Sequence, residues 1–241
     1  MRLWAIFALA VAACGVVRPS QAAGCPAPDE FVIAAGRLPA TEAAIRRGNL
    51  TILALGGAAT LGAPARGTEF TYPSRLAARL GDALPGVGIK LVVNAVPRQP
   101  IADLRLKLDA DLAGAKPALV IWGPGASAAG RGEDLGTFDD NINGVIARIQ
   151  SSGADLILMT LQYAPSVARI VNLYPYRMAV MRGAERAGVP VLDRYELMRF
   201  WSDTNFLNLD ATGTAVRVRV ARTLYDCMAE ILTKGITGAV K

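Results

Sequence analysis

A few polar side chains in this sequence could do chemistry together if the fold brought them to one crevice. The hydroxyls of Thr60, Ser127 and Tyr163 are candidate nucleophiles or proton donors, and Asp203 and Asp210 form a candidate acid–base pair. The chain contains no histidine. A Ser-His-Asp or Cys-His arrangement is therefore excluded, and so is a metal site built from imidazole.

Other residues give little support for catalysis. A serine–lysine pair would need a lysine beside these hydroxyls, but Lys90 lies in a predicted strand, Lys107 in a predicted helix and Lys116 at the opposite end of a predicted strand. Glu133 and Asp134 could hold a cation, yet no dense pattern of oxygen ligands surrounds them. We therefore expect no metal ion and no other cofactor.

The elements that must position these side chains alternate along the chain. Apolar runs of strand length alternate with segments of helical period, which is typical of a parallel sheet covered by helices. The near-continuous apolar strands predict burial on both faces of that sheet. We expect one three-layer α/β/α domain with a five-stranded, flavodoxin-like sheet. The expected strands span 51–55, 89–93, 118–122, 156–160 and 189–192. The expected helices are 41–47, segments opening at Pro73 and near Ile101, and then 138–150, 174–187 and 211–232.

The loops after the strands should form any ligand site. In an open parallel sheet, ligands bind beyond the carboxyl ends of the strands, near the point where the strand order reverses. Here the loops of interest are 56–69, 94–100, 123–134, 161–165 and 201–210. The candidate residues above all fall in these loops.

The start of the chain has the sequence pattern of an export signal. Met1-Arg2 precedes an apolar run over 3–13, and a stretch of small residues ends at Ala23, so we predict a signal peptide over 1–22. The alternative is an uncleaved anchor. An N-terminal extension would then span 23–49, the main domain 50–235 and a C-terminal tail 236–241. No apolar run after residue 30 reaches the length of about 20 residues that a spanning helix needs.

The cysteines fit an exported bacterial protein. The segment 11–14 is similar to the lipobox of bacterial lipoproteins, which makes Cys14 a candidate for lipidation and membrane attachment; the alternative is an ordinary signal peptide. Location is therefore expected to be periplasmic or anchored in the envelope. Cys25 and Cys227 remain as the internal thiols, and such a pair usually forms a disulfide in an oxidising compartment. Alternatively, Cys227 only fills the buried face of the last helix.

The charge of the chain argues against a nucleic-acid partner. The formal net charge is +6, but the arginines are spread over several predicted helices, and no aromatic residues are interleaved with them as a base-stacking platform would require. An anionic envelope surface or a polysaccharide is compatible with this charge. The sequence does not identify a protein partner.

Four short blocks resemble those of the SGNH/GDSL hydrolases, a superfamily of esterases and lipases. The run 52–62 resembles the first block, in which a strand ends in Gly-Asp-Ser-x-Thr and the serine is the nucleophile. Asn94 aligns with the start of the second block, Gly123 to Ala126 with the Gly-x-Asn-Asp block, and Asp203 to Asn208 with the Asp-x-x-His block. The similarity covers about 50–232 and implies the SGNH-hydrolase fold.

The sequence departs from the family pattern at the positions that do the chemistry. Ala58 stands at the nucleophile position and Phe206 at that of the base. Gln99 is the counterpart of the second-block oxyanion donor, and Gly125 stands where the third block has its asparagine. Asp203 alone is retained from the fourth block. The resemblance therefore implies a degenerate member that lacks the catalytic serine, asparagine and histidine.

We interpret the chain as a non-catalytic binding or scaffold protein of the bacterial envelope, a pseudoenzyme. The resemblance alone suggests a glycan or acyl-group ligand. Alternatives are an active acyl or acetyl esterase with a relocated mechanism, and a structural partner of an active paralogue. For Trp122 and Phe206 core packing is an equal alternative, Thr60 could buttress its own loop, and Ser127 could serve a turn. The candidate ligand-binding residues are Thr60, Arg98, Gln99, Trp122, Ser127, Tyr163 and Asn205, with Phe206 beside them.

Overall fold

Five parallel strands form one sheet in the order β2-β1-β3-β4-β5. The computed structural model describes residues 24–31 and 36–240. The predicted signal peptide and the lipidation candidate Cys14 lie outside the described residues. The strands are β1 (Asn49–Gly56), β2 (Gly88–Ala95), β3 (Leu119–Trp122), β4 (Asp155–Met159) and β5 (Val191–Leu192). The predicted parallel five-stranded sheet is confirmed.

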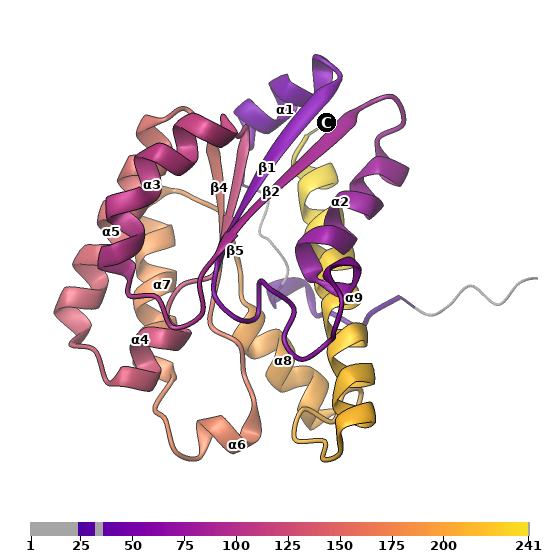
Figure 1. Ribbon diagram of the computed structural model, residues 1–241, viewed down its shortest axis with the longest axis vertical. Helices are drawn as coiled ribbons and strands as arrows, with labels where there is room; N and C mark the ends of the chain where they lie inside the picture. The colour runs from indigo at the N-terminus through magenta and orange to yellow at the C-terminus, as the bar shows by residue number, and fades with distance from the viewer. Residues whose placement is uncertain (1–23, 32–35, 241) are drawn as a thin grey trace, which may run out of the picture.

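Helices cover both faces of the sheet, which gives three layers (Figure 1). On one face α3, α5 and α7 pack together, and on the other α2 packs along α9, with α1 against β1. The helices are α1 (Pro39–Arg46), α2 (Tyr72–Ala83), α3 (Ile101–Ala115), α4 (Ala126–Arg131), α5 (Leu135–Ser151), α6 (Pro165–Ala168), α7 (Tyr174–Ala187), α8 (Arg194–Asp203) and α9 (Thr214–Ala239). Short 3-10 turns, η1 (Asp29–Phe31) and η2 (Thr68–Phe70), precede α1 and α2.

Local sequence explains where several helices begin and end. The Thr71 hydroxyl accepts a hydrogen bond from the Ser74 amide and caps α2, whose first turn contains Pro73. The Asp134 carboxylate does the same for α5 through the Thr137 amide. Gly188 ends α7 in a left-handed conformation, which glycine adopts without steric cost.

The sheet is buried unevenly. Most residues of β1, β3 and β4 are buried, and they join two apolar cores, one on each face. The edge strand β2 is different, since Val93 is 41% exposed and none of its residues is fully buried. The expectation of burial on both faces is therefore wrong for β2, which pairs with β1 alone among the strands of the described residues.

The first described residues and the last helix are joined to each other and to the rest of the domain. Cys25 and Cys227 form a disulfide with a Cα–Cα distance of 5.4 Å, so the N-terminal segment is tied to α9. The Trp201 indole N–H donates to the Pro26 carbonyl nearby. The expected C-terminal tail is mostly helix, because α9 continues to Ala239 and buries Ile236 completely. No helix of the described residues has the length and apolar character to cross a membrane.

Candidate functional site

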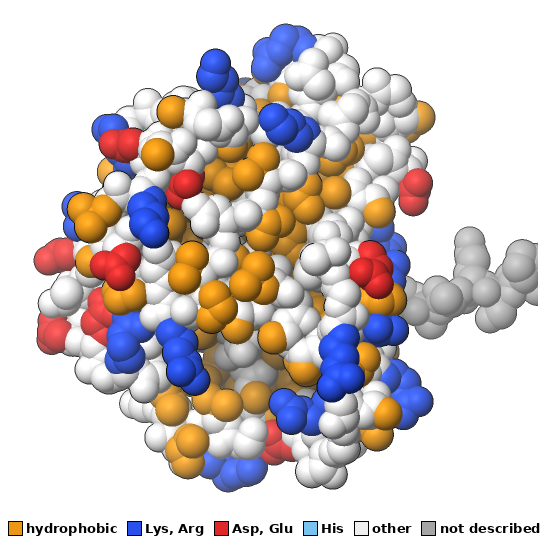
Figure 2. Space-filling model, viewed as in Figure 1, with side chains coloured by type: hydrophobic (Ala, Val, Ile, Leu, Met, Phe, Trp, Pro, Cys, Tyr) orange, Lys and Arg blue, Asp and Glu red, His pale blue; other side chains and the backbone are white. Residues whose placement is uncertain are grey.

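A cavity of about 530 Å³ opens beyond the carboxyl ends of β1, β2 and β3. These strands flank the point where the strand order reverses, which is where open parallel sheets bind ligands. The volume is that of a typical small-molecule site. Figure 2 shows a hollow in the lower part of this face of the molecule, bordered by apolar side chains and by Lys and Arg side chains. The cavity is lined by 56–60, 96, 98–101, 104, 122–128, 130, 131, 162 and 194.

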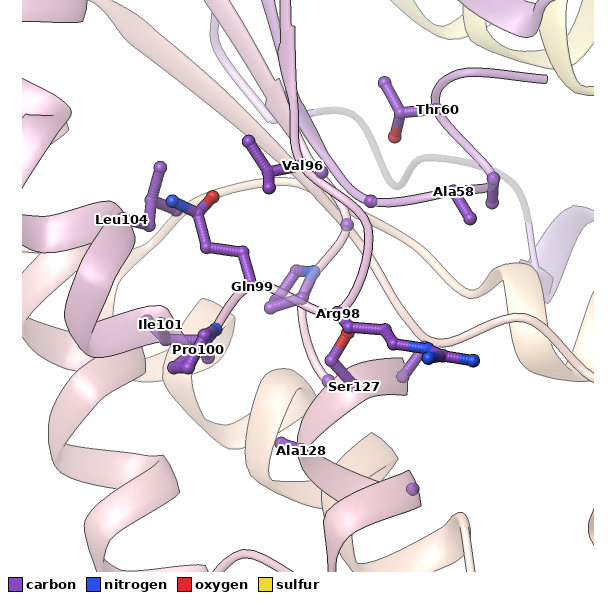
Figure 3. A pocket seen from close by; sticks show the side chains of 18 of the residues that line it. Ala58, Thr60, Val96, Arg98, Gln99, Pro100, Ile101, Leu104, Ser127 and Ala128 are labelled. Atoms are coloured by element: carbon purple, nitrogen blue, oxygen red, sulfur yellow. The ribbon is translucent and has the colours of Figure 1, made fainter. Parts of the chain in front are cut away.

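The loop after β1 supplies Ala58 and Thr60 to the cavity wall (Figure 3). Ala58 is exposed, so a methyl group faces the space where the resemblance places a nucleophile. Thr60 is only 3% exposed, and a Cβ at position 56 would collide with its hydroxyl oxygen. Gly56 is therefore required for the loop to fold back on itself, and Thr60 both buttresses the loop and lines the cavity.

The loop after β2 turns sharply at Arg98. Arg98 has a positive φ of 62°, and the Gln99 amide donates to the Val96 carbonyl at 3.3 Å. The amide that would correspond to the second-block oxyanion donor is thus already used inside the turn. Pro97 and Pro100, on either side, have no N–H to offer.

The loop after β3 approaches its neighbours closely at Gly125. Its φ is 103°, and a Cβ there would lie 2.8 Å from Cδ1 of Leu161 and 3.2 Å from Cζ of Phe138. Glycine is required because both the backbone conformation and the packing exclude a side chain. Ser127 follows in the first turn of α4, half-buried, and Trp122 is 2% exposed while it lines the cavity from the core.

Tyr163 does not line this cavity, contrary to the sequence-based expectation. Its ring packs edge-on against Tyr195, with 5.2 Å between centroids, and it borders a smaller hollow of about 150 Å³ beside α9. The adjacent residue Gln162 reaches the cavity instead. The prediction that the loop after β4 reaches the cavity is thus correct, but the residue that does so is Gln162 and not Tyr163.

The residues of the fourth block also lie outside the cavity lining. The Asp203 side chain is 64% exposed at the end of α8, beside Arg199. Asn205 turns the chain with a φ of 57°, and Phe206 is 39% exposed with its ring 6.0 Å from that of Trp201. The expectation that these residues line the crevice is wrong because the loop folds back onto α8. Asp210 instead accepts a hydrogen bond from the Ser166 amide and pairs with Arg169.

Arg194 is a cavity residue that sequence reasoning missed. It is the first residue of α8, is 5% exposed, and donates from Nε to the Thr160 carbonyl at 3.0 Å. The signal was present in the sequence, because Arg194 follows the fifth apolar run and therefore lies just beyond the end of a strand. Arg131, from α4, also lines the cavity unanticipated.

A buried polar network fixes the start of α8 and hence the position of Arg194. The Asp193 carboxylate caps the helix, accepts from the Thr160 hydroxyl at 2.8 Å and pairs with the Arg177 guanidinium. The Thr160 hydroxyl in turn accepts from the Tyr195 amide at 2.9 Å. Because each of these groups is satisfied inside the protein, the network positions the wall of the cavity and is not itself exposed to a ligand.

The titratable side chains among the residues that line the cavity are Arg98, Arg131 and Arg194; that lining contains no Asp, Glu, Lys or Cys. Arginine stays protonated in proteins and is a poor proton acceptor. No group of three or more His, Cys, Asp or Glu side chains in the described parts of the chain could hold a metal ion. The arrangement suits binding through hydrogen bonds, charge and apolar contact.

Solved structures with a similar fold include a lipolytic protein of the G-D-S-L family and several esterases. A lipolytic protein of the G-D-S-L family from Desulfitobacterium hafniense matches with a TM-score of 0.59 and 20% identity, over 78% of this chain and 99% of the other. A two-domain esterase active on acetylated mannans matches with a TM-score of 0.69 and 15% identity, over 88% and 56%. An acetyl xylan esterase from Geobacillus stearothermophilus matches with a TM-score of 0.60 and 17% identity, over 79% of this chain and 94% of the other.

The sequence matches the model of the Non-GDSL lipase-like family over residues 24–241. The chain therefore belongs to this family and has the SGNH-hydrolase fold. No curated protein matches the sequence.

Proposed function

We propose that this protein is a non-catalytic member of its family, which binds a small ligand in the cavity at the carboxyl ends of β1, β2 and β3. One observation carries the proposal: the residues that line the cavity include no group able to take a proton from a nucleophile. Ala58 offers a methyl group at the end of β1. The hydroxyls of Thr60 and Ser127 remain, but a hydroxyl is a weak nucleophile without an adjacent base.

Two oxyanion donors of the family pattern have no counterpart here for reasons of backbone structure. The Gln99 amide donates within its own turn, and the prolines beside it have no amide hydrogen. An asparagine at position 125 would meet Leu161 and Phe138. A tetrahedral intermediate formed here would thus lack two of the donors that stabilise it in hydrolases of this fold.

The structural neighbours and the residues that line the cavity together suggest which class of ligand it binds. Two of those neighbours are described as active on, or named for, acetylated polysaccharides. The cavity offers Trp122, Ile101 and Leu104 as apolar surface, with Gln99 and Gln162 as hydrogen-bonding groups. This mixture fits a sugar or an acyl group, so a glycan or acylated ligand of the envelope is the proposed partner.

Export to the bacterial periplasm or envelope is the proposed location. The predicted signal peptide over 1–22 supports it, with Cys14 as the residue for lipidation if the protein is a lipoprotein. The Cys25–Cys227 pairing is consistent with an oxidising compartment.

The test is hydrolysis of short-chain acyl esters and acetylated sugar esters by the purified full chain. The expected result is no turnover above that of buffer, and none in Ala58→Ser, because a serine there would still have no base. Turnover by the wild type that disappears in Ser127→Ala or Thr60→Val would instead establish the alternative, an ester hydrolase with a relocated mechanism.

A further inference from the structure

Arg194 places a buried cation without an acidic partner at the wall of the cavity. The residue is 5% exposed, and its one hydrogen bond among the described residues runs from Nε to the Thr160 carbonyl. No ion pair or hydrogen bond within the described residues involves its two Nη atoms. Arg177, by contrast, is also largely buried but pairs with Asp193 and Glu196. Arg177 therefore has acidic partners for its charge, whereas Arg194 has none among the described residues.

The surroundings of Arg194 do not neutralise its charge. Tyr72 and Tyr225 are the titratable groups that act on it, and burial raises the pKa of both phenols, that of Tyr225 to about 12, so they are neutral. Burial also lowers the pKa of Arg194 itself. An uncompensated buried charge destabilises a folded protein, whereas a bound anion would relieve that cost.

The mouth of the cavity adds charge of the same sign. Arg98 is exposed at the rim, and Arg131 donates from Nη1 to the Arg98 carbonyl at 3.2 Å while it also pairs with Glu133. The lining itself contains no carboxylate. A small anion entering the cavity would thus pass from one guanidinium at the rim to another at the wall.

We propose that the cavity recognises a small ligand through an oxyanion, a carboxylate or a phosphate, which pairs with the free Nη atoms of Arg194. The planar guanidinium matches both groups and forms two parallel hydrogen bonds with either. The rest of the ligand lies against Trp122, Ile101 and Leu104. This inference rests on the proposed binding function and specifies its ligand class.

The experiment is calorimetric titration of the purified full chain with matched charged and neutral probes. Glucuronate is compared with glucose and with the methyl ester of glucuronate, and glucose 6-phosphate and inorganic phosphate form the second arm. At least one charged probe is expected to bind about tenfold or more tightly than its neutral counterpart, as one charge-assisted hydrogen bond provides. The arm with the higher affinity distinguishes a carboxylate from a phosphate.

Three variants locate the effect. Arg194→Gln is expected to weaken binding of the charged probe by about tenfold or more while leaving the neutral probe unchanged. Arg98→Gln, at an exposed position, should weaken binding of the charged probe less than Arg194→Gln does and should make that binding less dependent on salt. Arg47→Gln removes an equal charge from an exposed site just before the amino end of β1 and should have no effect. Arg98→Gln and the wild-type comparison remain informative if Arg194→Gln does not fold.

Equal affinity for glucuronate and glucose, or no binding of any charged probe, would overturn the inference. So would unchanged affinity in a folded Arg194→Gln variant. These failures differ from failure of the proposed function, which would appear as ester turnover whatever the charge of the ligand. Binding of neutral acetylated sugars without any preference for anions would leave the binding function in place and reject only the oxyanion.

Discussion

Replacing Gly125 with alanine tests why the third-block asparagine has no counterpart in this chain. The φ of 103° is one that residues with a side chain rarely adopt, and the new Cβ would lie 2.8 Å from Cδ1 of Leu161 and 2.9 Å from its Cγ. Backbone strain of this kind costs about 1–3 kcal/mol. Overpacking a buried site costs a further amount of about 1–3 kcal/mol. The free energy of unfolding should therefore fall by about 2–6 kcal/mol.

Gly130→Ala is the matched control, since Gly130 lies in α4, the short helix that begins directly after Gly125. A Cβ there meets nothing within 4 Å, and alanine is the better helix former. The control should leave stability unchanged or raise it by up to about 1 kcal/mol.

Urea unfolding followed by tryptophan fluorescence measures both variants. A fall in the urea midpoint of Gly125→Ala, with an unchanged slope and a stable Gly130→Ala, is the expected result. If Gly125→Ala is as stable as the wild type, the packing around position 125 does not exclude a side chain. The loss of this oxyanion donor would then need another explanation.

Three further predictions concern stability. The pair Cys25→Ser with Cys227→Ser should lower the free energy of unfolding by up to about 5 kcal/mol, since the disulfide closes a loop across a sequence separation of 202; equal urea midpoints for both proteins would contradict this. Asp193→Asn leaves Arg177, 14% exposed, with Glu196 at 3.8 Å as its remaining carboxylate and should cost up to about 5 kcal/mol in the same assay, a loss below 1 kcal/mol being the contrary outcome. The pKa of Tyr225 is raised by burial from 10.0 to about 12. The contribution of its neutral phenol to the free energy of unfolding is therefore complete below pH 10 and is lost as the pH rises through 12. Tyr225→Phe should therefore lose stability less steeply than the wild type over this range, by about 1.4 kcal/mol per pH unit, and parallel pH profiles would refute that.

Much of the fold was predictable because the strands are short apolar runs separated by helices of regular period. The strands end where the pattern changes, so the sequence placed Ala58, Gln99 and Ser127 in loops that the parallel sheet gathers at one edge. The exposure of β2 was not predictable in the same way. Its apolar run is interrupted by Lys90, a residue type common on edge strands, but only the order of the strands in the sheet identifies β2 as an edge.

The fourth block shows where reasoning from short motifs failed. Phe206 follows Asp203 at the family spacing, yet its ring packs near Trp201, whose indole is in turn bonded to Pro26 of the N-terminal segment. Trp201 is thus held in part by a residue 175 positions away along the chain, a contact that local sequence does not reveal. Arg194 could have been found, because the rule about strand ends applies to the fifth strand as it does to the others.

The most direct test of the central claim is the intact mass of the purified full chain after exposure to a serine-reactive fluorophosphonate, under conditions that fully label an active serine esterase. The account predicts no adduct, because Ala58 has no nucleophilic atom and the hydroxyls that line the cavity have no base beside them. A stoichiometric adduct mapped to Ser127 or Thr60 would contradict it and identify the protein as a hydrolase with a relocated nucleophile.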